Sequence, residues 1–124
     1  MATLKKSWSA TILDFDLVSP NKLYRMHFAQ RSRWKKAIEA HLVAFGGDMP
    51  ELTPKIKLNI IRHYGYRKRA LDKDNLYGAC KPLIDAIRNF KIIPDDTPNH
   101  IDLHVTQQRS PNKTTFIEIV AVEI

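Results

Sequence analysis

The stretch RALDKDNLYGACKPLIDAI, residues 69–87, carries the strongest structural signal in the chain. Its apolar residues recur at helical spacing, at Leu76, Ala79, Cys80, Leu83, Ile84 and Ile87. This stripe predicts a helix packed on a sheet and makes Cys80 a small buried apolar residue rather than a nucleophile. The helix is expected to begin near Asp74 or Asn75, which are both good N-cap types. Pro82 lies inside it and predicts a kink near Gly78.

Alternating apolar and polar residues on either side of this helix predict strands. They cover residues 11–17, 55–63, 101–105 and 116–124, and the last run is apolar enough to lie centrally in a sheet. A further helix is predicted from Tyr24 to Phe45, with His41 on its apolar stripe as a core histidine. The turn residues at 111–113 predict that the last two strands pair as a hairpin.

The predicted order of elements is therefore β-α-β-α-β-β. It indicates an α/β (α+β) fold, one small mixed sheet of about four strands covered by two main helices. The 124 residues fit a single domain that spans residues 1–124.

Composition restricts the class of protein. Hydrophobic residues make up 44% and charged residues 27%, as in a folded globular domain. No apolar run reaches the ~18 residues of a membrane span, and the N-terminus lacks the apolar core of a secretory signal. With one cysteine and no internal disulfide, we expect a reducing, cytoplasmic setting. The net charge of +7 favours an anionic partner such as nucleic acid, although many small basic proteins bind nothing specific.

Acidic residues nevertheless gather beside the densest basic run, which is Arg67, Lys68 and Arg69. Asp72 and Asp74 follow that run directly, and Asp95 and Asp96 lie further on between two prolines. If the two acid pairs meet in the fold, they could hold Mg²⁺, which takes carboxylate and water oxygens. The basic run could then hold the phosphates of a polyanionic substrate.

Helical spacing also places Asp74, Lys81 and Asp85 on one face of the predicted helix. On that face Lys81 could offset negative charge on a phosphoryl group. The alternative is structural, with Lys81 and Asp85 as an ordinary i,i+4 pair and the other acids as caps or loop salt bridges. The sequence leaves both interpretations open.

The combined pattern resembles the RusA family of Holliday junction resolvases, which are crossover junction endodeoxyribonucleases typical of phages and prophages. The matching positions are a D-x-D-N at Asp72, Asp74 and Asn75, then Lys81, Asp85 and the Asp95-Asp96 pair. Ser19-Pro20-Asn21 with Tyr24 is also similar to an early segment of that family. The resemblance extends over nearly the whole chain.

The resemblance implies a Mg²⁺- or Mn²⁺-dependent homodimer that makes paired cuts across a four-way DNA junction in recombination and repair, inside a bacterial or phage-infected cell. Asp72, Asp74 and Asp96 would be the catalytic acids that bind the metal, and Lys81 the catalytic lysine. Asn75, Asp85 and Asp95 would support them. In the best-known member the lysine lies one turn nearer to the D-x-D, at the place that Gly78 occupies here.

Two other functions compete with this one. A non-enzymatic nucleic-acid-binding module would use the basic residues alone, and its binding would need no divalent ion. A phosphohydrolase of small nucleotides would use the acids, but the dense basic run fits a polymer better.

Overall fold

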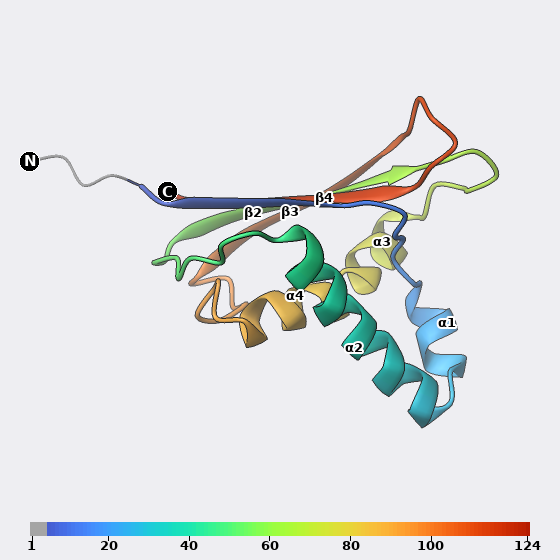
Figure 1. Ribbon diagram of the computed structural model, residues 1–124, viewed down its shortest axis with the longest axis horizontal. Coiled ribbons are helices and arrows are strands. Elements are labelled where there is room, and N and C mark those ends of the chain that lie inside the picture. The colour runs from blue at the N-terminus through green and yellow to red at the C-terminus, as the bar shows by residue number, and fades with distance from the viewer. Residues whose placement is uncertain (1–4) are drawn as a thin grey trace, which may run out of the picture.

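The computed structural model describes residues 5–124. Its elements follow the order β1 (Ser7–Ile12), α1 (Pro20–Arg25), α2 (Phe28–Phe45), β2 (Ile56–Tyr64), α3 (Lys73–Ala79), α4 (Lys81–Asn89), β3 (Ile101–Arg109) and β4 (Phe116–Glu123). The four strands form one mixed sheet in the order β1-β4-β2-β3, and the helices cover one face of it (Figure 1). The predicted fold class, a small mixed sheet with helices, is confirmed.

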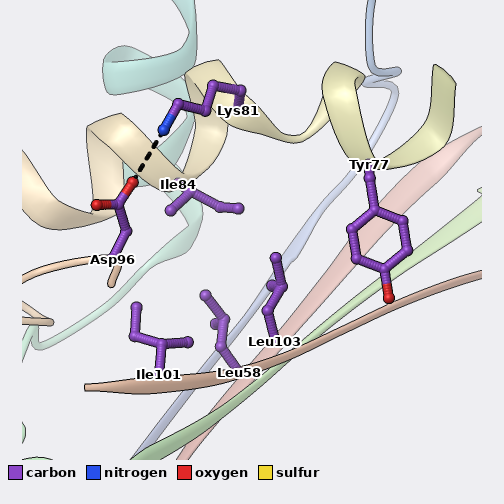
Figure 2. Close-up of a pocket in the computed structure, with 7 residues that line it drawn as sticks. All are labelled: Leu58, Tyr77, Lys81, Ile84, Asp96, Ile101 and Leu103. Carbon is purple, nitrogen blue, oxygen red and sulfur yellow. Dashed lines mark hydrogen bonds and ion pairs between the residues drawn. The ribbon is translucent and has the colours of Figure 1, made fainter. Parts of the chain in front are cut away.

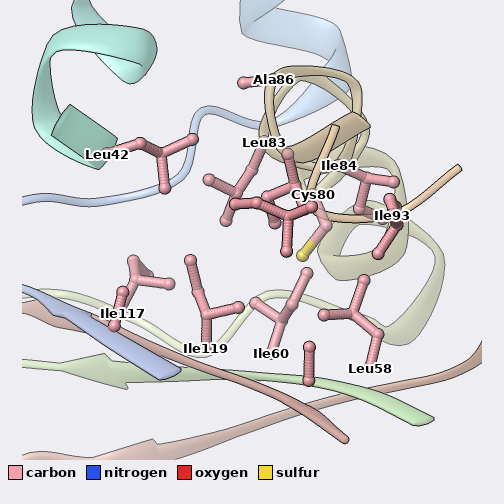
Figure 3. Close-up of a cluster of buried hydrophobic side chains, with 14 of the residues drawn as sticks. Leu42, Leu58, Ile60, Cys80, Leu83, Ile84, Ala86, Ile93, Ile117 and Ile119 are labelled. Atoms are coloured by element: carbon pink, nitrogen blue, oxygen red, sulfur yellow. The ribbon is translucent and has the colours of Figure 1, made fainter. Parts of the chain in front are cut away.

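The core lies between the sheet and the helices. Inward-facing residues of β2 and β4, including Leu58, Ile60, Ile117 and Ile119, are buried against Leu83 and other apolar residues of α4 (Figure 3). The whole stripe predicted from Leu76 to Ile87 is buried, including Cys80. Burial raises the pKa of the Cys80 thiol to about 12, so this cysteine is a packing residue, as predicted.

The predicted helix over residues 74–87 is two helices, broken at Cys80. The first begins two or three residues earlier than expected because Asp72, not Asp74 or Asn75, is its N-cap. Pro82 lies in the first turn of α4, where a missing N–H and a fixed φ suit the helix, so it starts a helix rather than kinking one.

The first predicted strand and helix also need correction. The strand β1 ends at Ile12, because the backbone turns at Asp14 with a φ of +50°, which leaves Leu13 exposed. The helix expected over residues 24–45 is divided into α1 and α2 by the extended backbone of Met26 and His27. His41 is half-buried and packs on Phe15, with 4.9 Å between ring centroids, in line with a core histidine.

The hairpin predicted between the last two strands is wrong. The strands β3 and β4 lie on opposite sides of β2, the first parallel to it and the second antiparallel. Their connection crosses the end of β2, where Ser110 N–H donates to the Tyr64 carbonyl at 2.8 Å. A Cβ at Gly65 would lie 2.4 Å from the Lys113 carbonyl oxygen, so the crossing depends on a glycine there. The prediction that the final strand is central is confirmed, since β4 lies between β1 and β2.

No helix in the described part of the chain is long and apolar enough to cross a membrane.

Candidate functional site

A cavity of about 150 Å³ opens between α3, α4 and the sheet (Figure 2). Its floor is apolar and is formed by Leu58, Ile84, Ile101 and Leu103, while Tyr77, Lys81 and Asp96 line the rest. The cavity is thus an apolar hollow with one cation and one carboxylate at its polar side.

The ammonium group of Lys81 lies 3.1 Å from the Asp96 carboxylate across this cavity (Figure 2). Arg88 Nη1 lies 3.4 Å from the other oxygen of Asp96, and both cations also pair with Asp85, at 3.9 Å from Lys81 and 3.7 Å from Arg88. The hydrogen bond from Lys81 is the main cause that lowers the pKa of Asp96. The fold therefore brings together two residues of the predicted site that are fifteen apart in sequence, in a cluster of two cations and two acids.

At the head of α3, Asp72 acts as the N-cap. One carboxylate oxygen accepts from the Asn75 backbone N–H at 2.8 Å, and the other accepts from the Asn75 side-chain amide at 2.9 Å. Asn75 thus completes the cap, and the structural interpretation accounts for Asp72 without an ion.

The other two predicted acids differ in their surroundings. Asp95 accepts a hydrogen bond from the Asp96 backbone N–H at 2.7 Å, which fixes the turn that carries Asp96. Asp74 is exposed in the first turn of α3, and within residues 5–124 its carboxylate makes no hydrogen bond or ion pair.

The three predicted metal ligands do not converge on one point. Within residues 5–124, no three acidic, histidine or cysteine side chains lie close enough to hold an ion. The predicted site of three carboxylates therefore does not fit this arrangement. The carboxylate of Asp96 is instead paired with two cations, Lys81 and Arg88. A smaller donor set fits better, since Mg²⁺ is often held by one or two carboxylates completed by water and substrate phosphate. The acids for such a set at the head of α3 are Asp72 and Asp74, and the carboxylate of Asp74 makes no hydrogen bond or ion pair within residues 5–124.

Close packing around Gly78 accounts for the lack of a side chain at this position. A Cβ at Gly78 would stand 2.5 Å from Cγ of Pro20, at the start of α1. No lysine side chain fits there. Lys81 is the next basic residue along the chain, and it reaches Asp96.

The basic run lies on the loop after β2, and buried side chains fix that loop. Arg62 is 3% exposed and binds Asp16 with two hydrogen bonds, of 2.7 and 3.1 Å. It also donates to the Arg69 carbonyl at 2.9 Å, while Gln107 binds both the N–H and the carbonyl of Leu71. The backbone just before Asp72 is therefore anchored to two strands.

Sequence analysis missed Arg62, Asp16 and Gln107. A signal existed for the first of them. Arg62 continues the inward-facing series Ile56, Leu58 and Ile60, and a buried guanidinium requires a carboxylate partner. The identity of that partner followed only from the fold.

No protein-family model matches the chain, and no curated protein matches it.

Proposed function

We propose that this chain is a metal-dependent endonuclease that cuts phosphodiester bonds in four-way DNA junctions. The observation that carries the proposal is the 3.1 Å contact between Lys81, the first residue of α4, and Asp96, in the loop between α4 and β3. It joins, through the fold, separate parts of the pattern shared with junction resolvases. The +7 charge of the chain supports a polyanionic substrate.

The chain's own residues would act in distinct ways. Arg67, Lys68 and Arg69 would hold phosphates on either side of the bond that is cut. Lys81, whose side chain is 65% exposed, would turn from Asp96 towards a phosphoryl oxygen of bound DNA. Arg88 would then remain as the partner of Asp96.

Asp72 and Asp74 would hold the divalent ion. When bound, Mg²⁺ or Mn²⁺ supplies an activated water and stabilises the leaving oxygen. Paired cuts across a junction require two active sites, so the proposed enzyme acts as a homodimer.

The direct test is cleavage of a synthetic four-way junction in Mg²⁺ or Mn²⁺, comparing the wild type with Asp74→Asn. We expect the variant to lose cleavage and to bind the junction at least as tightly, because a negative charge beside phosphates is removed. Asp48→Asn, the same change at an exposed acid in the loop after α2, is the matched control and should cut normally. Cleavage by Asp74→Asn at the wild-type rate would refute the proposal.

A second function has specific support. The cap formed by Asp72 is complete without an ion, because both of its carboxylate oxygens accept hydrogen bonds from Asn75. These contacts favour a nucleic-acid-binding module with no catalysis. Such a module would bind DNA equally in EDTA and in Mg²⁺ and would cut no substrate across a range of metals and junction sequences.

A further inference from the structure

Two hollows beside α1 share part of their lining, and most of the charged residues that line them are basic. The first, of about 400 Å³, lies between the segment after β1, the loop after β2 and α1. The second, of about 490 Å³, lies between α1 and α2. They share Lys22 and Trp34. We define the basic groove by six residues, Lys22, Arg33, Trp34, Arg62, Lys68 and Arg69.

The groove differs from the other hollows described in the number of its cations, since the hollow beside Phe28, which lacks a carboxylate, has only Arg31 and Lys35. Five cationic side chains line it, and Asp16 is the one carboxylate among its lining residues. By contrast, the hollow between α2 and α4 balances Lys35 and Arg88 against Glu39 and Asp85.

The one acid of the groove is already neutralised. Asp16 pairs with Arg62 at 2.7 Å and with Lys68 at 3.4 Å. Lys22, Arg33 and Arg69 are exposed and form no ion pair within residues 5–124. They are therefore available to an anion that enters the groove.

An aromatic ring occupies the middle of the groove. Trp34 lines both hollows and is half-buried, and its ring stacks on Phe15 with 5.3 Å between centroids and 6° between planes. A tryptophan held on one side by another ring leaves its remaining surface in a fixed orientation, as in the stacking platforms that bind unpaired bases.

We propose that the basic groove binds an unpaired strand of DNA, with Lys22, Arg33 and Arg69 on its phosphates and Trp34 against a base. Cations around a stacking ring match a single strand, because in a duplex the faces of the bases are covered by their stacked neighbours. Leu71 lines the groove and directly precedes Asp72, so the strand would lead to the head of α3. The choice of DNA and the path of the strand to α3 both rest on the proposed function.

Binding is tested in EDTA, where cleavage cannot occur, with a fluorescently labelled single-stranded oligonucleotide of about 15 nucleotides. We expect Lys22→Glu/Arg33→Glu to lose about tenfold or more in affinity at low salt. The matched control, Lys35→Glu/Lys36→Glu, makes the same change in net charge on residues outside the groove and should lose less than about threefold. Equal losses in both variants would show an effect of net charge alone and would overturn the inference.

A second measurement uses the wild-type protein alone, so it does not require any variant to fold. Trp8 is 4% exposed and donates to the Gly46 carbonyl, so acrylamide quenching reports mainly on Trp34. Bound single-stranded DNA should protect Trp34 from acrylamide, and duplex of the same sequence should protect it less. Binding that leaves quenching unchanged, or equal protection by duplex, would contradict the proposal.

The two proposals fail separately. If the groove variant loses binding but the wild type cuts no junction in any metal, the groove proposal stands and the nuclease proposal is rejected. Junction cleavage by the wild type, with the groove variant binding the single strand as tightly as the charge control does, would keep the nuclease and remove the groove.

Discussion

At the scale of single residues, Asp72 is the position where structural and catalytic roles must be separated. Its carboxylate caps α3 through the Asn75 N–H, and it is also a proposed metal ligand. Asparagine caps a helix about as well as aspartate but carries no charge. The two roles therefore respond differently to two substitutions at one site.

We predict that Asp72→Asn keeps the stability of the wild type and loses junction cleavage, whereas Asp72→Ala also loses about 1 kcal/mol of unfolding free energy. Urea denaturation and the cleavage assay measure the two effects. Full cleavage by Asp72→Asn would leave the residue with its capping role alone.

The pair formed by Lys81 and Asp96 predicts a pH dependence. The lysine lowers the pKa of Asp96 in the folded state, so the unfolded chain takes up this proton at a higher pH than the folded chain does. The pair's stabilisation is therefore present above the ordinary aspartate range and is lost as the pH falls through the folded pKa.

We expect Lys81→Met to raise the pKa of Asp96 towards the ordinary value, because the hydrogen bond from Lys81 is its largest cause. Carboxyl-detected ¹³C NMR titration of Asp96 measures the shift, and Lys91→Met, the same change at an exposed lysine after α4, is the control. An unchanged Asp96 titration in Lys81→Met would mean that the contact does not persist in solution.

At the scale of elements, the contact of α1 with α3 leaves no room for a side chain at position 78, between Asp74 and Lys81. Pro20 and Gly78 meet so closely that the glycine's missing side chain is part of the packing. Two residues distant in sequence are thus coupled by steric fit.

We predict that Gly78→Ala destabilises the protein by about 1–3 kcal/mol, since the new Cβ would stand 2.5 Å from Pro20 Cγ. Replacing Pro20 by alanine removes that Cγ, so Pro20→Ala/Gly78→Ala should recover much of the loss. Thermal or urea unfolding of the four proteins in a double-mutant cycle gives the coupling energy. Additive effects would show that the two helices separate easily.

At the scale of the whole molecule, the buried pair of Arg62 and Asp16 links distant parts of the chain. It joins β2 to the segment after β1, and Arg62 also donates to the Arg69 carbonyl in the basic loop. The loop that precedes the proposed site thus depends on a contact between residues 46 positions apart.

We predict that Asp16→Ala destabilises the protein by about 3 kcal/mol, because it leaves a buried guanidinium without its carboxylate. Asp48→Ala, the same change at an exposed acid in the loop after α2, should change stability far less. Urea unfolding measures both. A small effect of Asp16→Ala would mean that water or another acid reaches Arg62 readily.

The sequence by itself determined the elements whose signals are local. The alternation of Ile56, Leu58 and Ile60 and the apolar stripe from Leu76 to Ile87 were enough to predict one mixed sheet under helices, because periodic burial is written in the spacing of residues. The buried role of Cys80 followed from the same stripe.

Only the tertiary structure decided which distant residues meet. The path of residues 110–115 across β2, the partner of Arg62 and the closeness of Pro20 to Gly78 depend on contacts between segments whose separation in sequence carries no local signal. For the same reason the acids of the pattern could be listed but not placed. The sequence alone allowed Asp96 to lie beside Asp72 and Asp74. In the fold its carboxylate pairs with Lys81 and Arg88 instead, and these two cations stabilise its charge.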